Sequence, residues 1–191
     1  WMNPVFEERV IEETADRIVD ARTRGASRML AFGAHAIKNG LAPVMAKLIE
    51  DGWVTHLATN GAGIIHDWEF AFLGESSEHV AANVAQGRFG MWEETGFYLN
   101  LALAIGAHDG LGYGESVGTL VENEGLKIPG EESLISAITN GVERDAQKAA
   151  AAADLLHLVR RFELKPGWLD IPHPFRQYGL QAAAYRLGVP L

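Results

Sequence analysis

The sequence predicts an α/β fold with parallel strands, and three successive segments indicate it. Residues 28–32 form a short apolar run, a helical stripe follows from Gly40, and residues 53–59 form a second β-rich run. The order strand, helix, strand normally makes a right-handed parallel crossover. We therefore expect loops 33–39 and 60–67 to lie side by side at the carboxyl edge of the sheet, where ligands of open α/β sheets bind.

A helix is expected before the first strand. Asn3-Pro4 is typical of an N-cap followed by a first-turn proline, and Arg24-Gly25 is typical of a helix end. Between them, apolar residues recur at helical spacing from Phe6 to Val19.

Beyond residue 67 the pattern is mainly helical. Residues 122–132, which contain Pro129-Gly130, are expected to be an exposed connection. Val189-Pro190-Leu191 reads as the beginning of a further strand, which would leave the domain short of its C-terminal strands. The expected helices cover residues 78–86, 91–107, 114–124, 131–162 and 175–187.

Composition limits the classes of function. The 191 residues suit one domain, 1–191, and the net charge of −9 argues against nucleic acid or an anionic membrane as a partner. The absence of cysteine excludes thiol nucleophiles, Cys-ligated zinc and disulfides. The acidic start is unlike a signal peptide, and no apolar run approaches the ~20 residues that span a bilayer, so we expect a cytoplasmic protein.

The densest group of chemically capable residues follows the second strand. Asn60, Gly61, Ala62 and Gly63 precede a helix whose free N–H groups favour a phosphate or carboxylate. In the same helix, His66, Asp67 and Glu69 are candidate catalytic residues, because His66 and Glu69 share a face and could transfer protons. The alternative is structural: Asp67 as a first-turn acid and His66 as a satisfied, partly buried side chain.

The loop after the first strand holds a second group, Gly33, Ala34, His35 and Lys38. Lys38 could pair with a phosphate, and the small residues leave room for a nucleotide. Alone, Lys38 could equally be an exposed residue at a helix start. His35, His66 and the nearby carboxylates could bind zinc or iron, but no ligand spacing matches a known metal signature, so metal binding is a minor alternative and no metal site is assigned.

Two other motifs read as structural. Gly110-Leu-Gly112-Tyr-Gly114 lacks the strand and the glycine spacing of a dinucleotide fingerprint, so we expect a turn. Pro172-His173-Pro174 fixes an extended backbone, a feature that is usually structural but could present His173 to a site.

Together, Gly-Ala-His-x-Ile-Lys-x-Gly at 33–40 and Asn-Gly-Ala-x-x-Ile-His-Asp-x-Glu at 60–69 resemble the deoxyhypusine-synthase-like family of NAD-binding proteins. The chain is similar especially to uncharacterised bacterial members, and more distantly to the ornithine cyclodeaminase domain of the LOR/SDH group. The resemblance is strongest over residues 29–75 and continues through 89–94, 112–118 and 182–190. It implies a doubly wound, Rossmann-like parallel sheet with many helices.

The resemblance also implies a cofactor and a chemistry. NAD would bind through Gly33, Ala34, His35 and Lys38, and through Asn60, Gly61, Ala62 and Gly63. The enzyme would be an NAD-dependent transferase or lyase that removes hydride from a small amine or amino acid to form an imine. The competing hypothesis is a non-catalytic NAD or nucleotide sensor.

In this scheme His66 is the general acid or base, because an imidazole accepts and gives protons near neutrality. Asp67 orients it or binds the substrate ammonium, and Glu69 supports the pair. His66 stands where the synthases have a glutamate that faces the polyamine, and none of the five lysines lies in the tryptophan-containing motif of their active-site lysine. We therefore predict that the protein does not make deoxyhypusine. The resemblance also suggests a homodimer or homotetramer, and the abundance of aromatic residues near the site supports this expectation.

Overall fold

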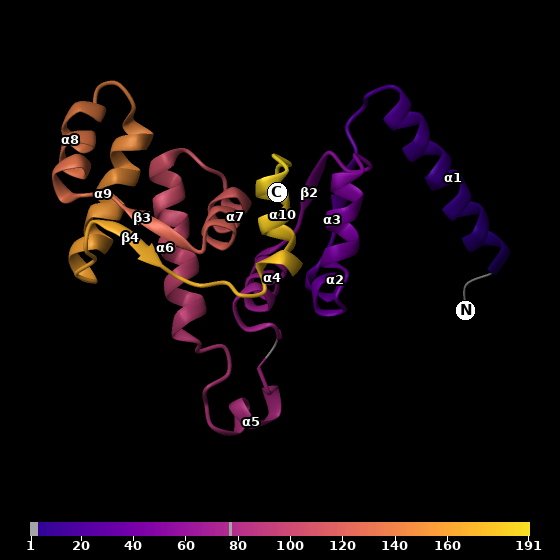
Figure 1. Ribbon diagram of the computed structural model, residues 1–191, viewed down its shortest axis with the longest axis horizontal. Coiled ribbons are helices and arrows are strands. Elements are labelled where there is room, and N and C mark those ends of the chain that lie inside the picture. Colours follow the sequence, from indigo (N-terminus) through magenta and orange to yellow (C-terminus); the bar gives the residue numbers. More distant parts are fainter. Residues whose placement is uncertain (1–3, 77) are drawn as a thin grey trace.

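The computed structural model describes residues 4–76 and 78–191, and helices dominate it (Figure 1). The expected N-cap Asn3 lies outside the described residues. No helix in the described ranges is both long enough and apolar enough to cross a membrane. The helices are α1 (Pro4–Thr23), α2 (Ala34–Lys38), α3 (Ala42–Glu50), α4 (Gly61–Leu73), α5 (Val80–Ala85), α6 (Glu93–Asp109), α7 (Tyr113–Asn123), α8 (Glu131–Gly141), α9 (Ala146–Arg161) and α10 (Leu180–Arg186), with a 3-10 turn, η1, at Arg176–Tyr178.

The predicted strand, helix, strand unit is present. β1 (Met29–Ala31) and β2 (His56–Ala58) pair in parallel, with Leu30 opposite Leu57, and α2 and α3 form the connection between them. The loop expected after the first strand is partly the short helix α2. On the other edge of β2, the N–H of Leu57 donates to the carbonyl of Pro190 at 2.9 Å, so the end of the chain lies against β2.

The doubly wound parallel sheet was a wrong prediction. The strands of the described ranges form two separate two-stranded sheets, of which only the β1–β2 pair is parallel. A parallel sheet needs its strands covered on both faces, yet Met29 in β1 is 61% exposed. The remaining apolar residues are spaced for helices, so the chain buries them by packing helices on helices.

The second sheet was not predicted. β3 (Gly125–Ile128) and β4 (Gly167–Asp170) pair antiparallel, with Leu126 opposite Leu169. Residues 122–132 are therefore not simply an exposed connection, because Leu126 and Ile128 belong to the core. The partner strand is some forty residues away in sequence, and no local signal marks such a pairing.

Two helix predictions were too long. The helix expected over 131–162 is divided into α8 and α9, which pack against each other as a helical hairpin. Asp145 ends the interruption by accepting a hydrogen bond from the N–H of Lys148 at 3.0 Å, as an N-cap does. The helix expected over 175–187 is reduced to η1 and α10. In the glycine motif at 110–114, residues 110–112 form the turn between α6 and α7 as predicted, whereas Tyr113 and Gly114 already belong to α7.

Two hydrophobic clusters form the core, and α4 and α10 lie where they meet. The larger cluster gathers α4, α6, α7, α9 and β3, and the smaller one gathers α2, α3, β2 and α10. In the larger cluster Trp68 is fully buried and stacks on Phe72, with ring centroids 4.8 Å apart. Trp68 therefore needs no subunit interface to cover it, which removes part of the basis for the expected oligomer.

His173 lies in this core rather than in a site. Its ring is fully buried, 5.6 Å from Phe72 and 6.2 Å from Trp68 between centroids, and neither ring nitrogen has a hydrogen-bond partner among the described residues. Burial away from water disfavours the charged ring and lowers the pKa of His173 to about 4.

The buried histidine should make the fold sensitive to acid. The unfolded chain takes up this proton near pH 6.5 and the folded chain only near pH 4, so stability should fall as pH decreases between these values. The difference corresponds to about 3 kcal/mol of unfolding free energy. Urea unfolding between pH 7 and pH 4 should show a smaller decline for His173→Phe than for the wild type. Equal declines would contradict the assignment.

Candidate functional site

Helix α4 separates two kinds of side chain onto two faces. Asn60 begins the helix, because its side chain accepts a hydrogen bond from the N–H of Gly63 at 3.0 Å. Ile64, Trp68 and Ala71 recur at helical spacing and are buried in the core. The face that carries His66 and Glu69 points elsewhere, toward a cavity.

His66 and Glu69 form a hydrogen-bonded group with a serine that the sequence analysis did not select. The Nδ1 atom of His66 lies 2.9 Å from Oε2 of Glu69 and 2.7 Å from Oγ of Ser76. The hydroxyl of Ser76 also donates to the same carboxylate oxygen at 3.1 Å. His66 and Glu69 are three residues apart on the helix, so their meeting follows directly from the spacing that predicted it.

This geometry favours one tautomer of the ring. A carboxylate only accepts hydrogen bonds, so the contact with Glu69 is a hydrogen bond only when Nδ1 carries the proton. The neutral ring then leaves Nε2 without a proton, and the nitrogen can act as a base. Because Glu69 is 8% exposed, its charge lies close to the ring with little screening by solvent.

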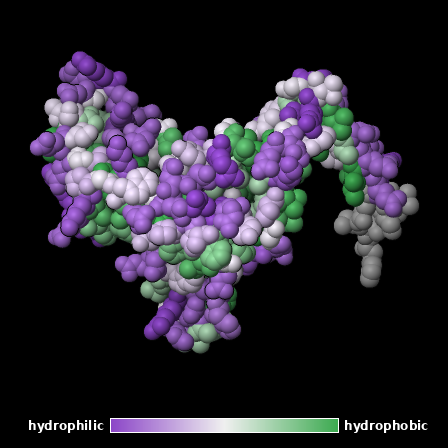
Figure 2. All heavy atoms as spheres, viewed as in Figure 1, coloured by the Kyte–Doolittle hydropathy of each residue, from purple (hydrophilic) through white to green (hydrophobic). Residues whose placement is uncertain are grey.

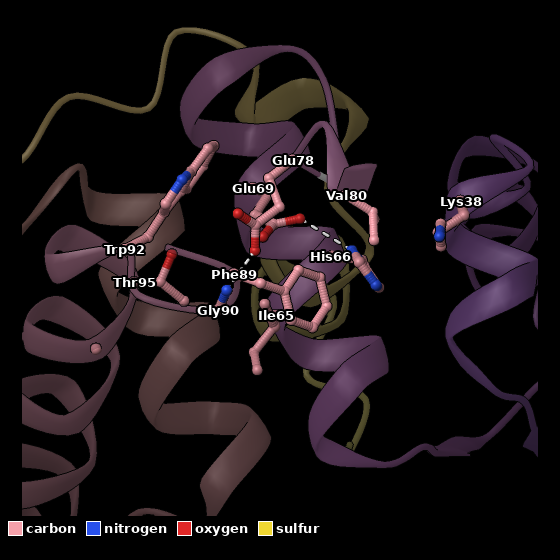
Figure 3. Close-up of a pocket in the computed structure, with 11 residues that line it drawn as sticks. Lys38, Ile65, His66, Glu69, Glu78, Val80, Phe89, Gly90, Trp92 and Thr95 are labelled. Carbon is pink, nitrogen blue, oxygen red and sulfur yellow. Dashed lines mark hydrogen bonds and ion pairs between the residues drawn. The ribbon is translucent and has the colours of Figure 1, made fainter. Parts of the chain in front are cut away.

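The group borders a cavity of about 440 Å³, shown in Figure 3. The volume is toward the lower end of the ~300–1,000 Å³ typical of small-molecule pockets. Lys38, from α2, lies at one end of the view and Trp92 at the other. The lining residues are Lys38, Ile65, His66, Glu69, Glu78, Val80, Phe89, Gly90, Trp92, Thr95 and Gly96.

One wall of the cavity comes from the segment between α4 and α6, which supplies Glu78, Val80, Phe89, Gly90 and Trp92. Glu78 shapes this segment, because its carboxylate accepts hydrogen bonds from the N–H of Gly90, at 2.6 Å, and from the side chain of Asn83. The wall places two aromatic rings, Phe89 and Trp92, beside two carboxylates. Thr95, in the first turn of α6, also lines the cavity. Its hydroxyl oxygen is buried and has no hydrogen-bond partner in the described ranges, so a bound polar group could satisfy it.

Asp67 lies on the other side of α4, away from this cavity. Its carboxylate is fully buried and accepts hydrogen bonds from the N–H groups of Leu180 and Gln181, both at 2.8 Å, and from the Gln181 side chain at 3.1 Å. Burial raises the pKa of Asp67, and the three donated hydrogen bonds oppose the rise. These contacts hold the first turn of α10 against α4, which is a structural role.

Most of the residues predicted to bind a cofactor lie outside the cavity. Of these, only Lys38 lines the cavity. The others lie near the carboxyl ends of β1 and β2, where loops 33–39 and 60–67 adjoin through the contact of α2 with α4. Of them, Gly33, His35, Asn60, Gly61 and Ala62 are exposed, Ala34 is half-buried and Gly63 is buried. Gly63 is required for packing, since a Cβ there would lie 2.2 Å from the hydroxyl oxygen of Thr59.

Sequence reasoning missed Ser76, which contacts His66 and Glu69, and the lining residues Glu78, Phe89, Trp92 and Thr95. No periodicity could place them, because they reach the cavity through a non-local fold of the chain. The resemblance over residues 89–94 was the one available signal, and it covers Phe89 and Trp92. Within the described ranges, no group of three or more His, Asp or Glu side chains is arranged to hold a metal ion.

Comparisons with models of known families, with curated proteins and with solved structures found no match to this chain. The resemblance to the deoxyhypusine-synthase-like family therefore stays a prediction from the two motifs.

The two acids of α4 should respond differently to substitution. Asp67→Asn turns an amide N–H₂ toward a donor of α10 and should lower the unfolding free energy by about 3 kcal/mol, because the buried network loses one of its two acceptor oxygens and the negative charge. His66→Asn changes a partly exposed polar group and should cost about 1 kcal/mol or less. Urea unfolding of both variants measures this. Equal losses, or a larger loss for His66→Asn, would contradict the separation of the two faces.

Proposed function

We propose that the cavity is the active site of an enzyme that acts at the carbon–nitrogen centre of a small amino acid or amine. The observation that carries the proposal is the His66–Glu69–Ser76 group, which orients an imidazole at the edge of the cavity with Nδ1 occupied. A base held by a carboxylate through its far nitrogen is a recurring arrangement in proton transfer.

In the proposed step, His66 removes a proton from the substrate ammonium. The N–H bond breaks, its electron pair stays on the substrate nitrogen, and Nε2 of His66 takes the proton. The free amine that results is the form that reacts at a carbon–nitrogen centre. Glu69 stabilises the imidazolium, since the ring then donates a charge-assisted hydrogen bond to its carboxylate.

The walls supply complementary groups for such a substrate. Phe89 and Trp92 offer ring faces that attract an ammonium group. Lys38 lies at the end of the cavity away from Trp92 in Figure 3 and would pair with a substrate carboxylate. The hydroxyl of Thr95, which has no hydrogen-bond partner among the described residues, would accept from, or donate to, a polar substituent.

NAD fits the described site only in part. The first turn of α4, at Gly61 and Ala62, is exposed and could receive a phosphate group. However, the space enclosed near Gly63 by Phe32, Leu180 and Leu191 has essentially no volume, and the 440 Å³ cavity contains only one of the predicted cofactor residues. NAD binding, with the hydride removal it would allow, stays a prediction from the resemblance, and the proposed proton transfer does not pass through it.

The substrate class can be tested with pairs of ligands, each pair being an amino acid and the amine that lacks its carboxylate. Calorimetry with a panel of such pairs should find an amino acid that binds, with Lys38→Met weakening it at least tenfold, or about 1.4 kcal/mol. The matching amine should bind the wild type and Lys38→Met alike. Lys127→Met is the control, because it removes an equal charge from the exposed face of β3.

Two further results decide the role of the histidine. His66→Asn should retain the binding of the amino acid within about threefold, because the ring moves a proton and does not hold the carboxylate, and it should abolish turnover. Failure of every pair to bind, or equal effects of Lys38→Met and Lys127→Met, would contradict the proposal. Binding without turnover by the wild type would favour the sensor.

A further inference from the structure

Helix α1 presents an apolar stripe that nothing in the described chain covers. Every side chain from Glu8 to Asp20 is exposed, including Ile11 at 67% and Val19 at 51%. Figure 1 shows α1 running away from the body, and Figure 2 shows hydrophobic side chains along it. A helix in water draws most of its stability from packing an apolar face, so this stripe calls for a partner.

A groove lies beside the stripe. Its volume is about 580 Å³, and one side of it is the second half of α1, with Ile18 and Val19. The other side comes from β1, α3 and the turn before β2, with Met29, Leu48 and Trp53. The groove and the stripe are therefore continuous, and a helix that covers one also fills the other.

The order of residues in the stripe identifies the partner. Residues 10–19 read Val-Ile-Glu-Glu-Thr-Ala-Asp-Arg-Ile-Val, so the apolar residues occur in the same order from either end. A two-fold axis across the helix near Thr14 and Ala15 would set Val10 against Val19 and Ile11 against Ile18 of a second copy. A two-fold interface must match itself in this way, whereas a different partner would impose no such symmetry.

The flanking charges agree with this arrangement. Glu13 and Arg17 are four residues apart, so both flank the stripe along the same edge of the helix. Glu13 precedes the proposed two-fold axis in the sequence and Arg17 follows it. In an antiparallel pair, Glu13 of each copy would reach about the level of Arg17 of the other. The small side chains Thr14 and Ala15 would stand at the crossing point, where two helices approach most closely.

We infer that α1 is a dimerisation helix. Two copies of this chain associate through antiparallel α1 helices, and α1 of each copy lies in the groove beside α1 of the other copy. The inference does not rest on the proposed function, because the stripe and groove are separate from the cavity that holds His66. It replaces the aromatic residues as the reason to expect a homodimer.

Light scattering on the purified chain tests the inference. The wild type should have twice the 20.8 kDa mass of one chain at about 10 µM. Ile11→Lys combined with Ile18→Lys should give the mass of a single chain. Its circular dichroism spectrum should show that the variant is still folded. Asp16→Lys, on the polar face of α1, adds the same total charge and should remain dimeric. A monomeric wild type, or a double variant that stays dimeric, would overturn the inference.

Single cysteines test the register of the two α1 helices. Because the chain has no cysteine of its own, any disulfide must come from the introduced residue. Thr14→Cys or Ala15→Cys should form a disulfide-linked dimer on mild oxidation, since both stand next to the proposed two-fold axis. Asp16→Cys should not. If neither central cysteine cross-links, or if all three cross-link equally, α1 is not paired in this way.

Discussion

The arrangement of the molecule depends on one buried carboxylate, that of Asp67. It receives the N–H groups of Leu180 and Gln181 at 2.8 Å, more than a hundred residues away in sequence. Those N–H groups belong to the first turn of α10, whose amides would otherwise be buried without partners. Gln181 adds a second link, because its side chain donates to the carbonyl of Ile64 at 2.9 Å. Since α10 packs against α7 and α3 as well as α4, this attachment joins the two hydrophobic clusters.

The same attachment fixes the rotation of α4, and with it the direction of His66. Asp67 and Trp68 face inward, so the residues at 66 and 69 must face the cavity, as the helical period requires. Two acids that are two positions apart in the helix thus have different roles: the carboxylate of Asp67 holds the fold and that of Glu69 holds a histidine. The wall that completes the cavity comes from the segment before α6, ordered by the carboxylate of Glu78.

The sequence predicted what depends on local spacing. The pairing of His66 with Glu69 follows from their separation by three residues, and the parallel pairing of β1 with β2 follows from the order of the elements. The break between α8 and α9 could also have been predicted from the sequence. Asn140-Gly141 is a signal for a helix end and Asp145 for a helix start, but the alanine-rich run obscured both. By contrast, the partner of Asp67, the β3–β4 sheet and the aromatic wall depend on contacts between distant segments. The doubly wound sheet failed because it was inferred from the resemblance, while the helical pattern beyond residue 67 pointed to helix packing.

The proposed chemistry requires Nε2 of His66 to be the free, basic nitrogen. Nitrogen-15 NMR of the imidazole ring, recorded at a pH at which the ring is neutral and assigned by the loss of its signals in His66→Asn, tests this directly. We expect the tautomer with the proton on Nδ1, and a change in this preference in Glu69→Gln. A neutral His66 that carries its proton on Nε2 would contradict the account, because the nitrogen that faces the cavity could then not accept a proton.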